Sequence, residues 1–167
     1  FGCGVGGDVF KFLESQEGLN FPEALRQLAG KAGITLPENR PRAGEKKSDD
    51  ERKALLAIIA EAADFFRKEL EGPAGSAARA YLKKRGLSDS VVKDFSLGWA
   101  KSEWDALLRH LKQKGHPAGL MEKAGLIVKR SEGEGHYDRF RGRIIFPIRD
   151  LSGNVIAFGG RVMDDSL

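Results

Sequence analysis

With 167 residues, the chain can form one ordinary domain, or a small domain plus part of a second. The hydrophobic fraction of 41% and the charged fraction of 31% are typical of a globular protein and exclude a chain that is mainly disordered. The net charge of +4 permits a nucleic-acid partner without requiring one, so the distribution of the charge is more informative than its sum.

The single cysteine, Cys3, excludes an internal disulfide framework and indicates a reducing compartment, so we expect a cytoplasmic protein. No apolar run reaches the roughly 18–20 residues that a membrane span needs, and no signal peptide is recognisable, so no membrane partner is expected. The first residue is Phe1 rather than methionine, and neither end has a closing element. We therefore expect a fragment of a longer protein.

Residues 1–35 predict a small α-helical unit. Asp8 is a suitable N-cap for a first helix over residues 9–14. Asn20 and Glu23 have the spacing of a capping box before a second helix, which a glycine at position 30 or 33 ends.

Residues 36–50 contain prolines and closely spaced charges without apolar periodicity, which predicts a linker. Ser48 and Glu51 then resemble a second capping box, before a long amphipathic helix that Gly72 and Pro73 interrupt. The apolar stripe of this helix consists of Leu55, Ile59, Ala62, Phe66 and Leu70.

Four short helices are predicted next, each between a start and a stop signal, at residues 76–86, 88–98, 102–115 and 117–125. After Gly125 the pattern changes to that of strands. Residues 127–128 and 136–137 flank a glycine-rich turn and predict a hairpin, and residues 143–149 and 154–158 predict two further strands. The fold class is therefore α+β, with a helical part that leads into an incomplete, antiparallel-type sheet.

Four arginines and no acidic residue lie between residues 139 and 149. Arg141, Arg143 and Arg149 share strand parity, although Pro147 can shift it, so they can form a row on one sheet face opposite the core. Guanidinium groups suit phosphate because they present a planar fork of permanently charged donors. The alternative is a solvated face whose arginines pair with carboxylates, and the pattern leaves both open.

Gly159, Gly160 and Arg161 follow a predicted strand, where backbone N–H groups and a guanidinium can approach an anion. A β-bulge or a tight strand exit is the alternative explanation. Neither a P-loop nor a dinucleotide-binding fingerprint is present.

Cys3 lies between glycines, as cysteines of zinc knuckles do, but tetrahedral zinc needs four ligands and the chain offers one cysteine and three distant histidines. The residues alone therefore favour a free cysteine. Asp164 and Asp165 are the only suggestive carboxylate pair for Mg²⁺, and adjacent aspartates usually form a turn. The sequence contains no convincing catalytic centre.

Four groups of segments, taken together, resemble one family. They are Phe1–Leu13; Leu19–Leu25 with Ala32–Ile34; Tyr81–Leu87 with Phe95–Ala100; and Tyr137–Asp150 with Val155–Arg161. The last group, which reads YDRFRGRIIFPIRD and VIAFGGR, is the most specific. In this order they resemble bacterial-type (DnaG-like) DNA primases.

The resemblance implies a fragment in three parts. Residues 1–35 would be the end of a zinc-binding domain, a helical remnant of a zinc ribbon; residues 36–50 a linker; and residues 51–167 the incomplete N-terminal subdomain of the RNA polymerase core, before the TOPRIM region. The parent would be a DNA-directed RNA polymerase that makes short RNA primers on single-stranded DNA template from NTPs. Its Mg²⁺ site would lie in TOPRIM, and a C-terminal region would bind the replicative helicase.

The resemblance also implies residue roles. Cys3 would be the last Zn²⁺ ligand, with three partners upstream. Arg85, Arg149 and Arg161 match basic positions that hold template or nucleotide, and Arg141 and Arg143 match less specifically. No catalytic residue would lie in this piece, which we expect to be inactive alone.

Two other classes of protein remain open at this point. One is a non-catalytic single-stranded DNA-binding module derived from the N-terminal half of a primase. The other is a structural or protein-docking α+β domain whose arginines are paired on its surface. The first predicts DNA affinity without polymerisation, and the second predicts negligible DNA affinity.

Overall fold

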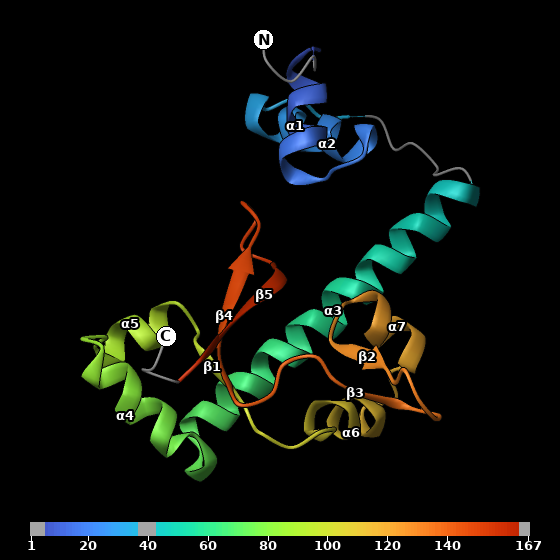
Figure 1. Cartoon of the computed structure of the whole chain (residues 1–167). Coiled ribbons are helices and arrows are strands. Elements are labelled where there is room, and N and C mark those ends of the chain that lie inside the picture. The colour runs from blue at the N-terminus through green and yellow to red at the C-terminus, as the bar shows by residue number, and fades with distance from the viewer. Residues whose placement is uncertain (1–5, 37–42, 164–167) are drawn as a thin grey trace. The chain divides into compact units, whose positions relative to one another are not determined.

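A computed structural model describes residues 6–36 and 43–163, with side chains from residue 49 onward in the second range (Figure 1). Cys3, Asp164 and Asp165 lie outside these residues. The chain divides into two compact units, Phe1–Lys46 and Lys47–Leu167, which are described separately. Helices combine with small antiparallel sheets, so the predicted α+β class is confirmed. None of the described helices is both long enough and apolar enough to cross a membrane.

The first unit is a pair of helices, α1 (Val9–Glu17) and α2 (Phe21–Ala32). Asp8 accepts a hydrogen bond from the Lys11 N–H at 2.9 Å, and both bonds of the Asn20–Glu23 capping box are present, as predicted. The second helix ends at Gly33, whose φ of 68° is left-handed, rather than at position 30.

The second unit is organised along α3 (Ala43–Glu71). This helix begins at Ala43, so the predicted helix start at Ser48 was wrong, and residues 43–50 of the predicted linker are helical. Ser48 lies inside a run rich in alanine, lysine and glutamate, which continues a helix more readily than it starts one. The buried stripe is formed by Ile58, Ile59, Ala62, Phe66 and Leu70.

All four predicted short helices are present, after the 3₁₀ turn η1 (Pro73–Gly75). They are α4 (Ser76–Lys84), α5 (Asp89–Asp94), α6 (Ala106–Gln113) and α7 (Ala118–Lys123). The second is shorter than expected, because the chain enters a strand, β1 (Gly98–Ala100), where a helix was predicted to end. A glycine begins this strand because a Cβ at position 98 would lie 2.5 Å from the Phe66 Cβ.

Four further strands follow. The predicted hairpin pairs β2 (Ile127–Lys129) with β3 (His136–Asp138), and the second antiparallel sheet has the order β1-β4-β5, with β4 (Arg143–Arg149) in the centre and β5 (Val155–Val162) at an edge. Strand β1 pairs only with residues 143–145 of β4. At Pro147 the strand therefore has one neighbour, which suits a residue without an N–H.

Helices cover both faces of the three-stranded sheet, as Figure 1 shows with α4 and α5 to the left of β1 and α6 and α7 to the right. Ile145 belongs to a core with α3, α6 and α7, and Ile144 belongs to a second core with α4. Both isoleucines are fully buried. The predicted division of β4 into an apolar face and an arginine face was therefore wrong.

Candidate nucleic-acid interface

The arginines of the β4 region do not form one row. Arg141 precedes the strand, Arg143 is its first residue, and Arg149 is its last, beyond a register shift between Ile148 and Arg149. Arg143 and Arg149 are six positions apart in extended chain, which corresponds to about 20 Å. The bulge and the length of the strand thus place these side chains in different surroundings.

Arg141 contacts two neighbouring aromatic rings. Its guanidinium carbon is 4.3 Å from the centre of the Trp104 ring and 4.8 Å from that of Tyr137, and the two rings meet edge to face at 5.6 Å. The guanidinium also donates to the backbone carbonyl of Asp138. Trp104 comes from the turn before α6 and Tyr137 from β3, so three separate segments meet here.

Asp138 connects these segments through hydrogen bonds. Its carboxylate is buried, and it accepts hydrogen bonds from the backbone N–H groups of Leu107 and Leu108 at 2.8 and 2.9 Å. It therefore caps α6 from a distant strand, whereas Asp105, at the N-cap position, makes no capping bond. Burial raises the pKa of Asp138 to about 6, although the two N–H donors act in the opposite direction.

Trp104 is the exposed part of this cluster. Its exposed fraction is 60%, and its backbone carbonyl accepts a hydrogen bond from the Asp138 N–H at 2.7 Å. Arg139, two residues after Tyr137 in an extended segment, is also exposed. An exposed indole on a fixed backbone, next to guanidinium groups, is suited to stack a nucleobase while the cations face its phosphates. We call Trp104, Tyr137, Arg139 and Arg141 the Trp104 surface.

Arg143 supports this surface instead of extending it. It is partly buried, and it donates to the backbone carbonyl of Arg141 at 3.3 Å. Its Cα lies opposite Ala100, and it shares a sheet face with Ile145. The side chain therefore braces the turn from which Arg141 projects.

Arg85 and Arg161 meet at one tyrosine. The guanidinium carbon of Arg85 is 5.9 Å from the centre of the Tyr81 ring, and the Nε of Arg161 donates to the Tyr81 hydroxyl at 3.4 Å. Arg161 is opposite Ile144 on β5, which places it on the α4 side of the sheet. Two residues that are 76 positions apart in the sequence are thus brought together on the surface.

Arg149 lies at the other end of the β4–β5 ladder. Its guanidinium donates to the Gly153 carbonyl at 2.8 Å and to the Ser96 hydroxyl at 3.0 Å. These bonds tie the β4–β5 turn to the segment after α5 and leave the side chain exposed. The predicted arginines therefore fall into three places: the Trp104 surface, the Tyr81 cluster and the β4–β5 turn.

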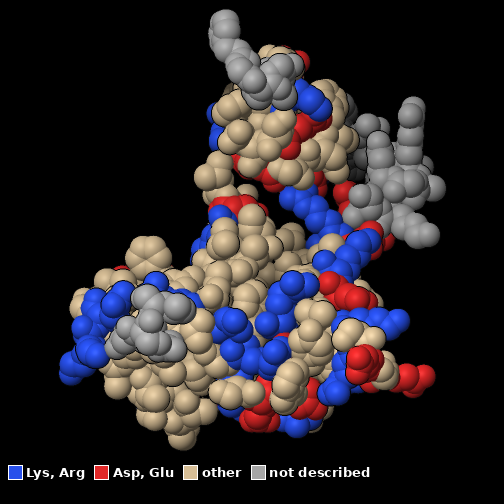
Figure 2. All heavy atoms as spheres, viewed as in Figure 1, with Lys and Arg blue, Asp and Glu red and all other residues tan. Residues whose placement is uncertain are grey.

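Figure 2 shows lysine and arginine side chains gathered on one face of the second unit, in one group over α4 and α5 and another between the sheet and α6. The basic residues of the α4 and α5 segments include Lys83, Lys84, Arg85 and Lys93. Both groups lie on the unit that carries the predicted arginines.

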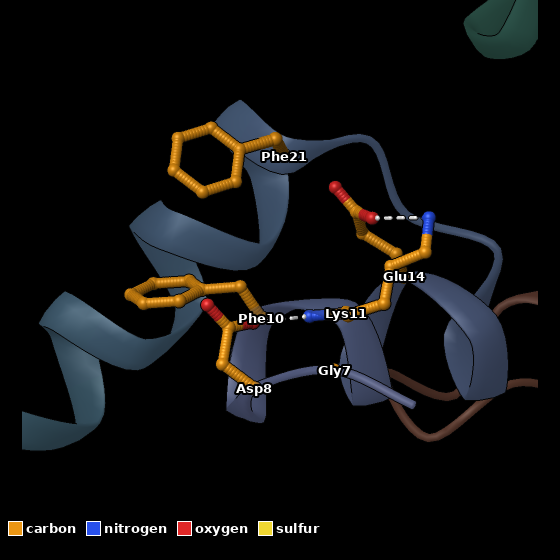
Figure 3. A pocket seen from close by; sticks show the side chains of 6 residues that line it. All are labelled: Gly7, Asp8, Phe10, Lys11, Glu14 and Phe21. Carbon is orange, nitrogen blue, oxygen red and sulfur yellow. Dashed lines mark hydrogen bonds and ion pairs between the residues drawn. The ribbon is translucent and has the colours of Figure 1, made fainter. Parts of the chain in front are cut away.

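The small unit has a hollow of its own, beside α1 and α2 (Figure 3). The rings of Phe10 and Phe21 border it with centres 5.4 Å apart, and Lys11 pairs with Glu14 at 3.1 Å. Since Asp8 is engaged as a helix cap, the charged groups that line this hollow are already paired with one another. It is not a candidate active site.

A metal site is not found among residues 6–36 and 43–163, where no three His, Cys, Asp or Glu side chains come together to hold an ion. The carboxylate and cysteine candidates of the sequence lie outside these ranges.

Sequence reasoning missed Trp104 and Asp138. Trp104 fell inside a predicted helix, although a lone tryptophan among polar residues at a helix start is a signal of an exposed aromatic group. Asp138 was taken only as one end of an arginine-rich run. Its role depends on α6, which is 30 residues away in sequence, and no local pattern indicates such a contact.

Two family models match the chain. The DNA primase catalytic core, N-terminal domain, matches residues 65–167, and the CHC2 zinc finger matches residues 1–44. Among curated relatives, the DNA primase of Deinococcus radiodurans is 46% identical over 166 residues, which are 99% of this chain and 27% of that protein. The DNA primase of Pseudomonas putida is 42% identical, and 25% of it is covered. The chain thus spans about a quarter of the length of these relatives.

Solved structures agree with this assignment. A DnaG primase catalytic domain bound to single-stranded DNA is 38% identical, with a TM-score of 0.64 over 71% of this chain and 36% of its own. The structure of the Aquifex aeolicus primase, comprising zinc-binding and RNA polymerase domains, is 30% identical, with a TM-score of 0.60 over 99% of this chain and 38% of that one. With the primase core model matching more than half of its residues, this chain belongs to the DnaG family of DNA primases.

Proposed function

We propose that this chain is part of a primase that synthesises short RNA primers on single-stranded DNA, and that this piece binds the template at the Trp104 surface. The observation that carries the proposal is the contact of an exposed indole, Trp104, with the guanidinium of Arg141. A template that must be copied at any sequence needs contacts that every nucleotide offers. Stacking on an aromatic ring and charge on the backbone meet that need.

Each residue of the surface has its own role. Trp104 stacks a base, and Tyr137, which contacts Trp104 edge to face, also supports the guanidinium of Arg141. Arg139 is exposed and faces phosphate, while Arg143 braces the turn. The stacking supports affinity for any sequence, and the cations make that affinity dependent on salt.

A second part of the proposal concerns the other arginines. Arg85 and Arg161, gathered at Tyr81, hold phosphates of the template or of an incoming NTP, and Arg149 orders the β4–β5 turn at the other end of the strand pair. The paired guanidinium groups suit a triphosphate better than isolated cations do, because each offers a planar fork of donors.

The metals and remaining partners are assigned by analogy with the family. Cys3 binds Zn²⁺ with three ligands from an upstream segment, in the manner of the matched CHC2 zinc finger. Mg²⁺ is held by a glutamate and an Asp-x-Asp pair of the TOPRIM region of the longer protein, and we assign no step of nucleotidyl transfer to the described residues.

The replicative helicase binds a C-terminal region, and the protein works in the cytoplasm. Residues 1–35, 36–50 and 51–167 correspond to the end of the zinc-binding domain, the linker and the beginning of the polymerase core.

Fluorescence anisotropy with a labelled single-stranded oligonucleotide, over a salt series, tests the template-binding proposal. The chain should bind, and Trp104→Ala should weaken binding about tenfold without changing the salt slope, because stacking involves no counterion. Arg139→Ala should reduce the slope of log K against log salt by about 0.7, the value for one phosphate contact.

Lys112→Ala is the matched control, since Lys112 is exposed at the opposite end of α6 and should leave binding nearly unchanged. Absence of binding at low salt would contradict template binding by this piece. Binding that survives in Trp104→Ala would exclude the Trp104 surface while leaving the Tyr81 cluster as the alternative site.

A further inference from the structure

Two carboxylates flank the tryptophan of the Trp104 surface. Glu103 and Asp105 are its neighbours in sequence, and their side chains are 48% and 42% exposed. A phosphate chain that passes over Trp104 would lie within a Debye length of both, about 10 Å at 0.1 M salt. Left alone, these two charges would repel the ligand that the indole and the arginines attract.

Arg109, one turn into α6, contacts both carboxylates. Its Nη2 pairs with Glu103, and its Nη1 lies 3.1 Å from the Oδ1 of Asp105. The hydrogen bond from Arg109 is the main cause of the lowered pKa of Glu103, so that carboxylate stays ionised and stays paired. Lys101 is 3.7 Å from Glu103 but lies closer, at 3.1 Å, to Glu69.

The arrangement has little to do with stability. The side chains of Arg109, Glu103 and Asp105 are all at least 42% exposed, and ion pairs of this kind contribute between zero and about 1 kcal/mol. The backbone of Trp104 is instead fixed by its hydrogen bond from Asp138. We therefore expect Arg109 to act mainly on the electrostatic potential at the Trp104 surface, which it makes less negative.

We propose that Arg109 is a positioning residue for template binding, which offsets part of the negative charge of Glu103 and Asp105 and so keeps the Trp104 surface attractive to a single-stranded nucleic acid. This inference rests on the proposed template binding. Arg109 acts through the carboxylates, not through a phosphate: both of its terminal nitrogens are engaged by carboxylate oxygens.

The test compares four chains by anisotropy with the labelled oligonucleotide: wild type, Arg109→Ala, the double variant Glu103→Gln/Asp105→Asn, and the triple variant. At about 50 mM salt, Arg109→Ala should bind about three- to tenfold more weakly, and the difference should disappear near 0.5 M salt, where the charges are screened. The double variant should bind more tightly than wild type, because Arg109 is released. The triple variant should recover at least wild-type affinity.

The outcomes separate this inference from the one that it rests on. If the triple variant binds as weakly as Arg109→Ala, Arg109 contacts the nucleic acid directly and the charge-offsetting role is wrong. If Arg109→Ala binds like wild type while Trp104→Ala is weakened, the inference fails and template binding stands. If wild type itself does not bind, both fail. Thermal melting of each variant verifies that the chains are equally folded.

Discussion

Asp138 connects the fold to the candidate interface at the scale of a single residue. Its carboxylate caps α6, its N–H fixes the Trp104 carbonyl, and its own carbonyl receives Arg141. The first of these contacts depends on the side chain and the other two on the backbone. Replacement of the side chain therefore separates the stability of α6 from the geometry of the surface.

Asp138→Ala should lower the free energy of unfolding by about 2–4 kcal/mol, because two buried N–H groups at the start of α6 lose their acceptor. Asp105→Ala is the control, since the nominal N-cap makes no capping bond and should change stability by less than about 1 kcal/mol. Urea denaturation followed by tryptophan fluorescence measures both, and both tryptophans, Trp99 and Trp104, lie in the second unit. Equal effects of the two variants would contradict the capping role.

The same pair of chains tests the raised pKa of Asp138, which is about 6 in the folded protein against an ordinary value of 3.8. The folded state binds the proton more tightly than the unfolded state, so the associated stabilisation is present below about pH 4 and is lost as the pH rises to about 6. It amounts to at most about 3 kcal/mol. The stability of wild type should therefore fall more between pH 4.5 and 7 than that of Asp138→Ala. Parallel pH profiles would show that the carboxyl titrates at its ordinary pKa.

At the residue scale the arginines stay a prediction as binding residues, and the structure corrects the expected surroundings of their side chains. The arginines were identified from their density along the chain, but strand parity placed Arg141, Arg143 and Arg149 together. The register shift at Ile148/Arg149 and the stacking of Arg141 on Trp104 separate them. Neither a bulge nor a contact across 37 residues leaves a periodic signal in the sequence.

At the scale of elements, caps and breakers located the helices well, because each signal is local. Capping bonds at Asp8, Asn20 and Ser88 are present where the sequence predicts them. The missed strand β1 is three residues long, too short for alternation to be visible, and it exists because β4 pairs with it. Its formation is a tertiary effect.

The close approach of β1 to α3 gives a prediction about Gly98. A Cβ at this position would lie 2.5 Å from the Phe66 Cβ and 2.9 Å from its carbonyl carbon, so strand and helix would have to move apart. Gly98→Ala should destabilise the second unit by about 1–3 kcal/mol, the usual cost of overpacking. The urea midpoint by tryptophan fluorescence measures this.

Gly119→Ala is the matched control for Gly98→Ala. Gly119 lies within α7, and a Cβ there has nothing within 4 Å, so alanine should be neutral or stabilise by up to about 1 kcal/mol through its helix propensity. If both variants behaved alike, the packing of β1 on α3 would be looser than the structure has it.

At the scale of the whole molecule, the resemblance of the sequence to a known family was the most informative basis for prediction. Four ordered groups of segments identified the primase family, and the matched models and relatives bear this out. The α+β class was predicted separately, from the change from a helical to a strand pattern after Gly125, and the elements confirm it. The resemblance did not predict where the Trp104 surface lies. Its location depends on which side chains of distant segments stay outside the two cores. Family membership predicts the fold of the chain more directly than the contacts of one side chain.

The two units should differ in stability, because they differ in core. Buried apolar side chains of the described part of the first unit are Leu13, Ala24 and Ala29, whereas the second unit has two cores that cover both faces of its sheet. The described helical pair, residues 6–36, is shorter than the roughly 40 residues below which a folded unit usually needs a metal or a partner for independent stability. Structural zinc contributes on the order of 10–16 kcal/mol in such units, and this chain has one cysteine for it.

We therefore expect the amides of α1 and α2 to exchange with deuterium within seconds to minutes, while those of α6 and β4 exchange last, since slow exchange requires a stable core around the hydrogen bonds. Hydrogen exchange with mass spectrometry on the whole chain measures both units in one sample. Added Zn²⁺ should leave the pattern unchanged, because a tetrahedral site needs four ligands. If α1 and α2 were as slow as α6, the contact of Phe10 with Phe21 and the two helix caps would be enough to hold the small unit without metal.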